Sequence, residues 1–496
     1  MLSALVLIPA AAGLLAFFIR PAPWRRALLL LTAGAHAGLT ASLWVRAPGP
    51  GWGGVLALDA IGQLFLTITS GLFLVAAVYA VGYLGREFPG AREDFVEGFR
   101  FTNAPEAVFT GCLLFFLATM TLVVVSDHLG LLWVAIEATT LASAPLIYFH
   151  RHHRSLEATW KYLLICSVGI GLALLGNFFL VVAATAPGGA SLPLSAKLLT
   201  EQAAALQTPW LKGAFLFLLI GYGTKMGLAP LHTWLPDAHS EAPSVVSALL
   251  SGALLNCAFV GILRVLQICG AAGLGTYTGG MLIVFGLLSI ALAAAFLVAQ
   301  ADYKRLLAYS SVEHMGILAL GVGVGGAATF GAMLHAVNHS VVKAMLFLLA
   351  GNILAAYRTK TARDVRGLFR RVPVTGALWV AGLFAIAGSP PFGTFASELL
   401  ILRGALEQGR FAIAALYLAL LTVAFVGMAA TMTRMAQGEG PSPAMPGAAG
   451  ESRLAVLPPL ALLAASLILG VYLPAGLSAA LRSAAALVGA GVPAIR

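Results

Sequence analysis

Charged residues are scarce in this sequence: Asp, Glu, Lys and Arg make up 10% of its 496 residues, and 60% are hydrophobic. Soluble domains average about 25% charged residues, and no polar segment here is long enough to build a core of its own. Apolar runs of about 20 residues recur from end to end, and each is sufficient to cross roughly 30 Å of hydrocarbon. Since these runs do not alternate in character as barrel strands do, the sequence predicts an all-α, polytopic membrane protein.

Cysteine is equally rare, and the known cofactor motifs are missing. The four cysteines show no CxxC spacing and lie in apolar runs, where cysteine behaves as a small hydrophobe. GVGVGG (321–326) has the glycine spacing of a dinucleotide loop, but it ends an apolar helix and no strand precedes it. We therefore expect no cofactor and no catalytic redox chemistry on this chain itself.

Hydropathy predicts about fourteen transmembrane helices, and a short interfacial helix in the tail 476–496. The predicted spans are 2–20, 26–46, 59–85, 106–126, 129–149, 158–184, 210–230, 243–268, 274–299, 305–325, 328–357, 374–403, 411–436 and 454–475. The first run has neither a basic segment before it nor a small-residue cleavage site. We interpret it as a retained helix and not as a signal peptide.

The net charge of +10 reflects membrane topology, because the basic residues are scattered over the loops and form no nucleic-acid-binding face. With the N-terminus outside, cytoplasmic connections hold 19 of the 29 Lys and Arg residues and external segments hold 8. The remaining 2, Lys225 and Lys343, lie within the membrane. The asymmetry predicts an external N-terminus.

Two matching interruptions predict a repeat. GLAP (227–230) and GSPPFG (388–393) each break the fourth span of a five-helix block. Consecutive blocks with an odd number of helices insert in opposite orientations, and paired broken helices are typical of transport paths, although Gly and Pro are common in membrane helices generally. The predicted units are an N-terminal three-helix segment (1–105), inverted five-helix repeats (106–268 and 274–436), and a C-terminal helix and tail (437–496).

An acid and a base lie inside the first predicted repeat, where a charge at the bilayer centre costs about 2.5–3.5 kcal/mol. Glu137 lies in span 129–149, and Lys225 lies beside the first break. A neighbouring carboxylate favours the charged form of lysine, whereas burial alone favours the neutral form. Opening and closing a Glu137–Lys225 pair would therefore make the lysine release or hold a proton. A static ion pair that only fixes helix packing is the alternative.

The second repeat contains a further group of titratable residues. His335, His339 and Lys343 recur every four residues and share one helix face. His314 lies on the preceding span, and Glu398 follows the second break. The HxxxH pair lacks the glutamate of HExxH and no carboxylate lies nearby, so we expect no metal site. A hydrated proton relay ending at Glu398 is favoured, and core histidines bonded to backbone carbonyls are the alternative.

The segment after the first break is rich in polar residues, namely His232, Asp237, His239 and Glu241. It is either a cytoplasmic entrance for protons or simply an ordered loop. Asp59, at the beginning of span 59–85, is predicted to cap that helix.

The sequence resembles the antiporter-like proton-translocating subunits shared by respiratory complex I (subunits L, M and N), Mrp sodium/proton antiporters and membrane-bound hydrogenases. The resemblance covers roughly residues 106–410. It is carried by VAIEATTL, WKYLLICSVGIGLALLG, KMGLAPLHTWLPDAHSEAPS, YSSVEHMGI, AVNHSVVKAMLF and GSPPFGTFASELLIL. The sequence of these motifs is most similar to that of hydrogenase-4 component F of formate hydrogenlyase-type complexes.

The resemblance implies roles for single residues. Glu137 would be the fifth-helix glutamate that pairs with the seventh-helix Lys225, and Lys161 would modulate that pair. Many relatives carry a lysine or histidine on the eighth helix where this chain has Asn256, so the link between half-channels would depend on water there or on the second repeat. The relay and its exit would be formed by His335, His339, Lys343 and Glu398.

We therefore expect a proton-translocating subunit of a redox-driven complex in the cytoplasmic membrane of a prokaryote. Its partners would be other membrane subunits and, through them, a peripheral redox arm. A subunit of a sodium/proton antiporter, a subunit of an energy-coupled inorganic-carbon uptake complex, and a passive membrane scaffold are the alternatives. Protons are favoured over sodium, because sodium needs clustered carboxylates or carbonyls and the predicted spans hold few carboxylates.

Overall fold

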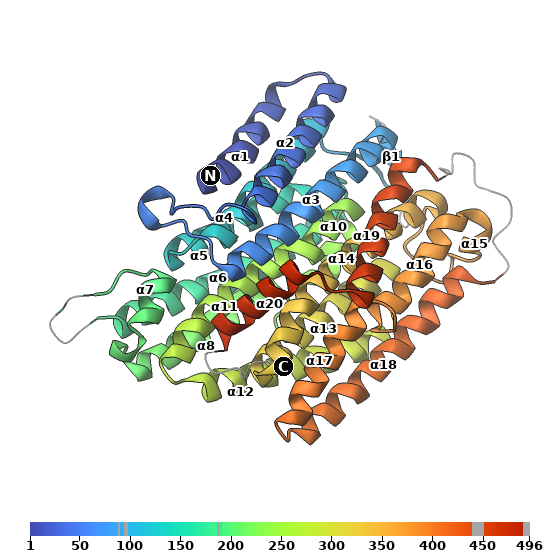
Figure 1. The fold of residues 1–496 in the computed structure, drawn as a ribbon. Helices are drawn as coiled ribbons and strands as arrows, with labels where there is room; N and C mark the ends of the chain where they lie inside the picture. Colours follow the sequence, from blue (N-terminus) through green and yellow to red (C-terminus); the bar gives the residue numbers. More distant parts are fainter. Residues whose placement is uncertain (88–89, 94–97, 186–188, 190, 439–450, 490–496) are drawn as a thin grey trace.

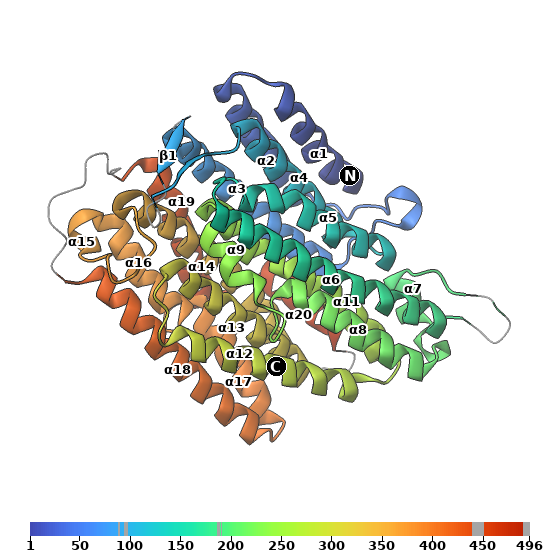
Figure 2. The same ribbon diagram turned by 180° about the vertical axis from the view of Figure 1, so that it is seen from behind.

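The computed structural model describes residues 1–87, 90–93, 98–185, 189, 191–438 and 451–489. Nearly all of the regular structure in these ranges is helical, which confirms the all-α class. Two short strands, β1 (Ala91–Glu93) and β2 (Arg100–Thr102), pair antiparallel beyond the end of α3. The helices run roughly along one common direction (Figures 1 and 2), as they do in a membrane bundle.

The helices follow the predicted order. The N-terminal segment contains α1 (Leu2–Phe18), α2 (Ala22–Ser42), η1 (Trp52–Gly54) and α3 (Ala60–Arg86). The next stretch contains α4 (Glu106–Val125), α5 (Leu129–Ile147), α6 (His153–Ala183), α7 (Ala196–Glu201), η2 (Ala203–Ala205), α8 (Thr208–Met226), α9 (Trp234–Glu241), α10 (Ser244–Leu249), the π-helical turn η3 (Leu250–Leu254) and α11 (Leu255–Ala271). The rest contains α12 (Gly275–Leu297), α13 (Tyr303–Val324), α14 (Ala327–Tyr357), α15 (Leu368–Arg371), α16 (Pro373–Ile386), α17 (Gly393–Glu407), α18 (Phe411–Ala436), α19 (Arg453–Val471) and α20 (Ala475–Val488).

Each of the predicted spans coincides with one helix or with helices that continue one another. In the described part of the chain, 10 helices are long and apolar enough to cross a membrane, with α10 to α11 taken as one. The other four predicted spans correspond to α1, α2, α8 and the broken pair α16–α17. The division into an N-terminal segment, two five-helix repeats and a C-terminal tail stays a prediction.

The centre of the molecule is occupied by α14. It packs against α13, α16, α17, α19 and α20, and against α10 from the first half of the chain. In both views α1 and α2 lie at one edge and α18 at the opposite edge (Figures 1 and 2). The helix that carries His335, His339 and Lys343 is therefore surrounded by other helices, and these three side chains are fully buried.

The first predicted break lies between α8 and α9. Gly227 ends α8 with a φ of +85°, and a β-carbon there would approach Leu235 Cδ1 to 2.5 Å, so both its conformation and its surroundings require glycine. The Ala229 amide donates to Ser289 Oγ on α12 at 2.9 Å. The indole of Trp234 donates to the Thr224 carbonyl at 2.9 Å. Neighbouring side chains thus satisfy backbone groups that the break leaves free within the bundle.

The second predicted break separates α16 from α17. Asn338 of α14 donates from Nδ2 to the Gly393 carbonyl at 2.7 Å, and the Ser389 amide donates to the Phe384 carbonyl at 3.0 Å. Both breaks therefore exist where the Gly/Pro motifs placed them, and each is supported by hydrogen bonds from the bundle.

Three local expectations are met or refined. Asp59 caps α3 as predicted, because its Oδ1 accepts from the Gly62 amide at 2.8 Å, and it also pairs with Arg264 of α11. The segment after the first break forms helix α9 and is not a simple loop. The interfacial helix expected in the tail corresponds to α20, which packs against α3 and α14.

Candidate functional site

The ammonium group of Lys225 lies in the interior of the first half of the chain. Its side chain is fully buried, and Nζ donates to Thr140 Oγ1 at 2.8 Å and to Tyr162 Oη at 2.6 Å. Nζ also lies 5.9 Å from the centre of the Trp234 ring, whose face attracts a cation. The base predicted from the sequence is thus held by hydroxyl groups of α5 and α6.

Glu137 reaches Lys225 through a hydroxyl group and not directly. Its carboxylate accepts from Thr140 Oγ1 at 3.2 Å and from Ser167 Oγ at 2.8 Å. These two charged groups form no direct ion pair in the described structure, so the expected contact pair is corrected to a pair bridged by Thr140. Glu137 is only half-buried, because it lies on the side of α5 that faces α6 and the periphery of the subunit.

Tyr162 extends this network and was not singled out from the sequence. Its hydroxyl lies 2.7 Å from Ser143 Oγ and accepts from Lys225. The resulting chain of polar groups links Glu137, Thr140, Lys225, Tyr162 and Ser143. Hydroxyl groups can donate and accept at once, so this chain can pass a proton between its members.

Lys161 does not contact Glu137 or Lys225 in the described structure, although the resemblance implied that it modulates them. It pairs instead with Glu157 at 2.6 Å and with Asp237 of α9 at 2.9 Å. Asp237 also pairs with Arg305 of α13 at 2.6 Å. Two residues with separate expected roles therefore belong to one partly exposed ionic network that joins α6, α9 and α13.

The end of α9 carries a second, more enclosed ionic network. Glu241 accepts from Lys360 Nζ at 2.8 Å, and Lys304 Nζ donates to the Ser240 carbonyl at 3.0 Å. Burial acts to raise the pKa of Glu241, but the charges of Lys360, Arg154 and Lys304 outweigh it and lower the pKa to about 2. Glu241 is therefore ionised and serves as an anchor for the loop that carries Lys360.

The two histidines near α9 have different surroundings. His239 is fully buried and stacks on Phe347 of α14 at 4.8 Å, and neither ring nitrogen finds a hydrogen-bond partner in the described part of the protein. His232 lies against the Tyr309 ring at 6.2 Å. Buried polar atoms of this kind are normally satisfied by water, which makes His239 a better candidate for a hydrated entrance than for a structural contact.

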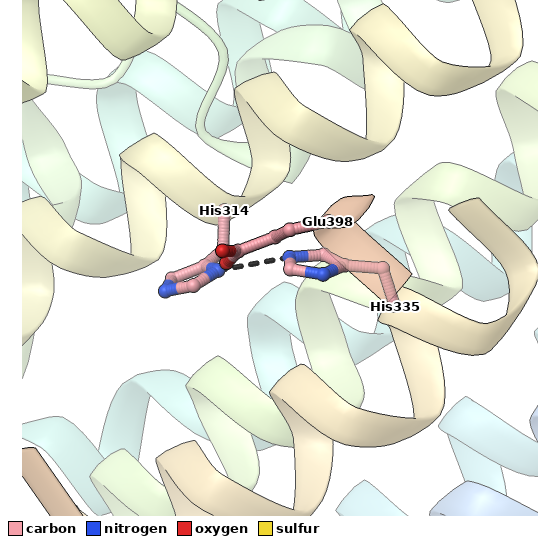
Figure 3. A group of neighbouring side chains, drawn as sticks. All are labelled: His314, His335 and Glu398. Atoms are coloured by element: carbon pink, nitrogen blue, oxygen red, sulfur yellow. Dashed lines mark hydrogen bonds between the residues drawn. The ribbon is translucent and has the colours of Figure 1, made fainter. Parts of the chain in front are cut away.

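The histidines of the second half form a direct contact. His314 Nδ1 lies 2.9 Å from His335 Nε2 (Figure 3). His335 Nδ1 lies 2.9 Å from Ser397 Oγ. The His339 ring lies 5.3 Å from the His314 ring, centre to centre. Lys343 Nζ donates to the Leu307 carbonyl at 2.8 Å. The predicted helix face is confirmed, and α13 and α17 complete it.

Glu398 joins this group from α17, as Figure 3 shows. One ligand-type atom from each of His314, His335 and Glu398 lies within 4.8 Å of the others. The sequence argument that no carboxylate lies near the histidines is therefore wrong in three dimensions. The facing nitrogens of the two rings nevertheless share a hydrogen bond, which needs a proton between them. His314 and His335 are thus joined by a hydrogen bond, and Glu398 lies beside them.

Glu313 is a buried carboxyl group that the sequence analysis did not single out, although it precedes His314 in YSSVEHMGI. Together with Glu398 it lines a small cavity of about 20 Å³, which is otherwise bounded by apolar side chains such as Phe425 and Met428 of α18. An acidic residue next to a histidine within an apolar span was the sequence feature that could have identified Glu313 as a candidate site residue.

Asn256 connects the two halves. Its Nδ2 donates to the Gly252 carbonyl at 3.0 Å and to Ser340 Oγ of α14 at 2.7 Å, while Oδ1 is buried with no partner among the described residues. The neighbouring Cys257 lies within the electrostatic reach of Lys225. Asn256 thus joins α11 to the helix that carries the histidines, and its free oxygen can bind water.

Comparisons with known proteins identify relatives of the chain. The hydrogenase-4 component F homolog of Methylacidiphilum infernorum (isolate V4) is 38% identical over 373 residues, which cover 75% of this chain and 76% of that protein. Hydrogenase-4 component B of Escherichia coli (strain K12) is 30% identical over 376 residues, which cover 73% of this chain and 52% of that protein.

Solved structures show the same fold over nearly the whole chain. A chain of the membrane-bound sulfane sulfur reductase, an archaeal respiratory membrane complex, matches with a TM-score of 0.84 at 20% identity and covers 98% of this chain and 97% of that one. A chain of respiratory complex I from Thermus thermophilus matches with a TM-score of 0.80 at 25% identity, over 99% of this chain and 100% of that one. The profile of the NADH:quinone oxidoreductase/Mrp antiporter transmembrane family matches residues 126–424, and the chain belongs to this family.

Proposed function

We propose that this chain is a proton-translocating membrane subunit of a redox-driven complex of the membrane-bound hydrogenase or complex I type. Other subunits would carry the redox chemistry, and this chain would carry protons through its interior. The observation that supports the proposal most directly is Lys225, a fully buried base whose hydrogen bonds lead to the half-buried carboxylate Glu137 through Thr140.

The bridged pair explains how an event outside the chain changes the proton affinity of Lys225. The bonds of 2.8 and 3.2 Å through Thr140 place the Glu137 carboxylate within about 6 Å of Nζ. At an effective dielectric of about 20, two unit charges at that distance interact by roughly 3 kcal/mol, which is about a hundredfold in affinity for a proton. Neutralising or displacing Glu137 is therefore enough to release the proton of Lys225.

The released proton has a polar route into the second half of the chain. Asn256 of α11 donates to Ser340 of α14, which directly follows His339 and precedes Lys343 by three residues, and we infer that the proton reaches α14 at this contact. His314, His335 and Glu398 continue from there by direct contact. His239 is the proposed entrance, and Lys161 and Asp237 control access to it from the exposed ends of α6 and α9.

The place of the chain in the cell follows from the same proposal. Its relatives and structural neighbours are subunits of multisubunit membrane assemblies, and we place this chain in the cytoplasmic membrane beside other membrane subunits. The excess of Lys and Arg on alternate connections supports an external N-terminus.

Sodium/proton antiport is the second candidate function. A Na(+)/H(+) antiporter subunit from Alkalihalophilus pseudofirmus (strain ATCC BAA-2126 / JCM 17055 / OF4) is 31% identical over 359 residues, which cover 69% of this chain and 41% of that protein. In addition, Glu313 and Glu398 bring two carboxyl groups to one cavity. Replacing sodium by choline in the transport assay separates the two functions, because only antiport requires the sodium ion.

The proposal is tested with Lys225→Ala in the assembled complex, reconstituted into vesicles that contain a pH-sensitive dye. We expect redox turnover to continue without proton uptake. Lys212→Ala is the matched control, because Lys212 is exposed at the other end of the same helix. If the Lys225→Ala complex assembles and pumps protons as well as the Lys212→Ala complex does, the proposed function is wrong.

A further inference from the structure

Two acidic side chains from different helices share one cavity in the second half of the chain. Glu313 of α13 and Glu398 of α17 are 5% and 9% exposed, and both line the cavity of about 20 Å³ beside α18, which has room for about one water molecule. Ile386 and Ala387, at the end of α16, close another side of it. The cavity therefore lies at the second helix break, where backbone irregularity leaves room for water.

The charges around this cavity do not neutralise two carboxylates. Lys343 of α14 attracts Glu313, while Glu398 and Glu313 repel each other when both are ionised. The hydroxyl of Tyr417 on α18 is buried and interacts electrostatically with both acids. It has no hydrogen-bond partner among the described residues. Two close carboxyl groups with a single cation nearby favour sharing a proton, because like charges in a low dielectric cannot both persist.

Adjacent residues of α13 face different partners. His314 faces His335 of α14 at 2.9 Å, whereas Glu313 faces the cavity that also holds Glu398. Both sides lead to the same carboxyl group, since Glu398 also lies beside the two histidine rings (Figure 3). The geometry thus provides two separate approaches to Glu398.

We propose that Glu313 and Glu398 form a two-carboxyl proton-binding site around a hydrated cavity, and that Glu313 carries protons from Lys343 to Glu398 on a branch separate from the histidines. The ammonium of Lys343 becomes an amine as the Glu313 carboxylate becomes a carboxylic acid. That proton then passes through cavity water to Glu398. The inference rests on the proposed function and adds a residue and a route to it.

Infrared spectroscopy tests the site without relying on transport. Difference spectra of the reconstituted complex across a pH step should show the carbonyl band of a buried carboxylic acid, shifted in D₂O. Glu398→Gln and Glu313→Gln should each change this band. In the Glu313→Gln variant the remaining carbonyl band of Glu398 should also shift in frequency, because the two acids interact. Glu407→Gln is the control, since Glu407 is exposed on α17 and pairs with Arg403 one turn away. Identical band changes in Glu313→Gln and Glu407→Gln would overturn the proposal.

Transport measurements test the branch. Glu313→Gln and His335→Ala should each lose part of the proton uptake, and the double variant should lose far more than either one. Glu313→Asp should recover uptake, because it keeps a carboxyl group at the cavity. Recovery in this variant would also show that the protein tolerates a substitution at position 313. If Lys225→Ala abolishes uptake while Glu313→Gln pumps like Glu407→Gln, the branch is wrong and the proposed function stands. If Lys225→Ala leaves uptake intact, the proposed function itself fails.

Discussion

Gly388 lies directly against the carboxylate of Glu398. A β-carbon at position 388 would overlap Glu398 Oε2, and the backbone of Gly388 has a φ of +62°. The glycine of the second helix break therefore determines where the carboxyl group lies, because only a residue without a side chain leaves that space to Glu398.

The Gly388→Ala variant should displace Glu398 from the histidines and the cavity, and proton uptake in vesicles should fall. Gly409→Ala is matched to it, since Gly409 has a φ of +70° and a β-carbon added there would meet nothing within 4 Å. Both variants introduce similar backbone strain, of order 1 kcal/mol, and the overlap with Glu398 should lower the thermal stability of the Gly388→Ala variant further. Equal proton uptake by the two variants would show that the contact with Glu398 is unimportant.

The bridge between Glu137 and Lys225 predicts a specific role for the Thr140 hydroxyl. Thr140→Val keeps the shape of the side chain but removes a hydrogen bond to a charged group, which is worth about 1.5–3 kcal/mol. We expect proton uptake to fall roughly tenfold or more, and Thr140→Ser to retain it.

Thr139→Val is the control for this experiment. Thr139 is also buried on α5, but its hydroxyl donates at 2.6 Å to the Ile136 carbonyl of its own helix. Uptake by the Thr139→Val complex should stay close to that of the unmodified one. A Thr140→Val complex that pumps equally well would contradict the hydroxyl bridge.

Glu241 predicts a dependence of stability on pH. Its pKa is lowered from 4.5 to about 2 in the folded chain, so its contribution is fully present above about pH 4.5 and is lost as the pH falls through about 2. The contribution is about 3 kcal/mol at most. The unfolding temperature of the detergent-solubilised protein should therefore drop between about pH 5 and about pH 3, and Glu241→Gln should flatten this drop. Glu201→Gln, on the exposed end of α7, should leave the drop unchanged.

Much of the fold could be predicted from the sequence because bilayer physics is strict. Only a helix satisfies every backbone group across the hydrocarbon, so long apolar runs translate directly into spans. The Gly/Pro motifs 227–230 and 388–393 located both helix breaks, since glycine and proline together disfavour the helical backbone, although α19 continues through Pro458 and Pro459. Helix α9 was missed because its composition is polar, although Pro236 in its first turn is compatible with a helix start.

The site was predicted less completely, because contacts depend on how helices are rotated against one another. The sequence places Glu137 and Lys225 on different spans of one block, yet only the packing of α5 and α8 against α6 shows that Thr140 and Tyr162 lie between or beside them. The approach of Glu313 and Glu398 likewise joins residues that are 85 positions apart in the chain. The spacing of polar residues along each helix does not indicate that these two side chains line the same cavity.

The hydrogen bond from the Ala229 amide to Ser289 fastens the first helix break to α12, a helix of the other half of the chain. If α12 moved away, the Ala229 amide would lose its hydrogen-bond partner in an apolar environment, at a cost of several kcal/mol. The lysine next to the break and the histidines beyond it consequently belong to a single mechanical unit. A conformational change in one half of the chain therefore displaces the other half as long as the hydrogen bond between Ala229 and Ser289 is intact.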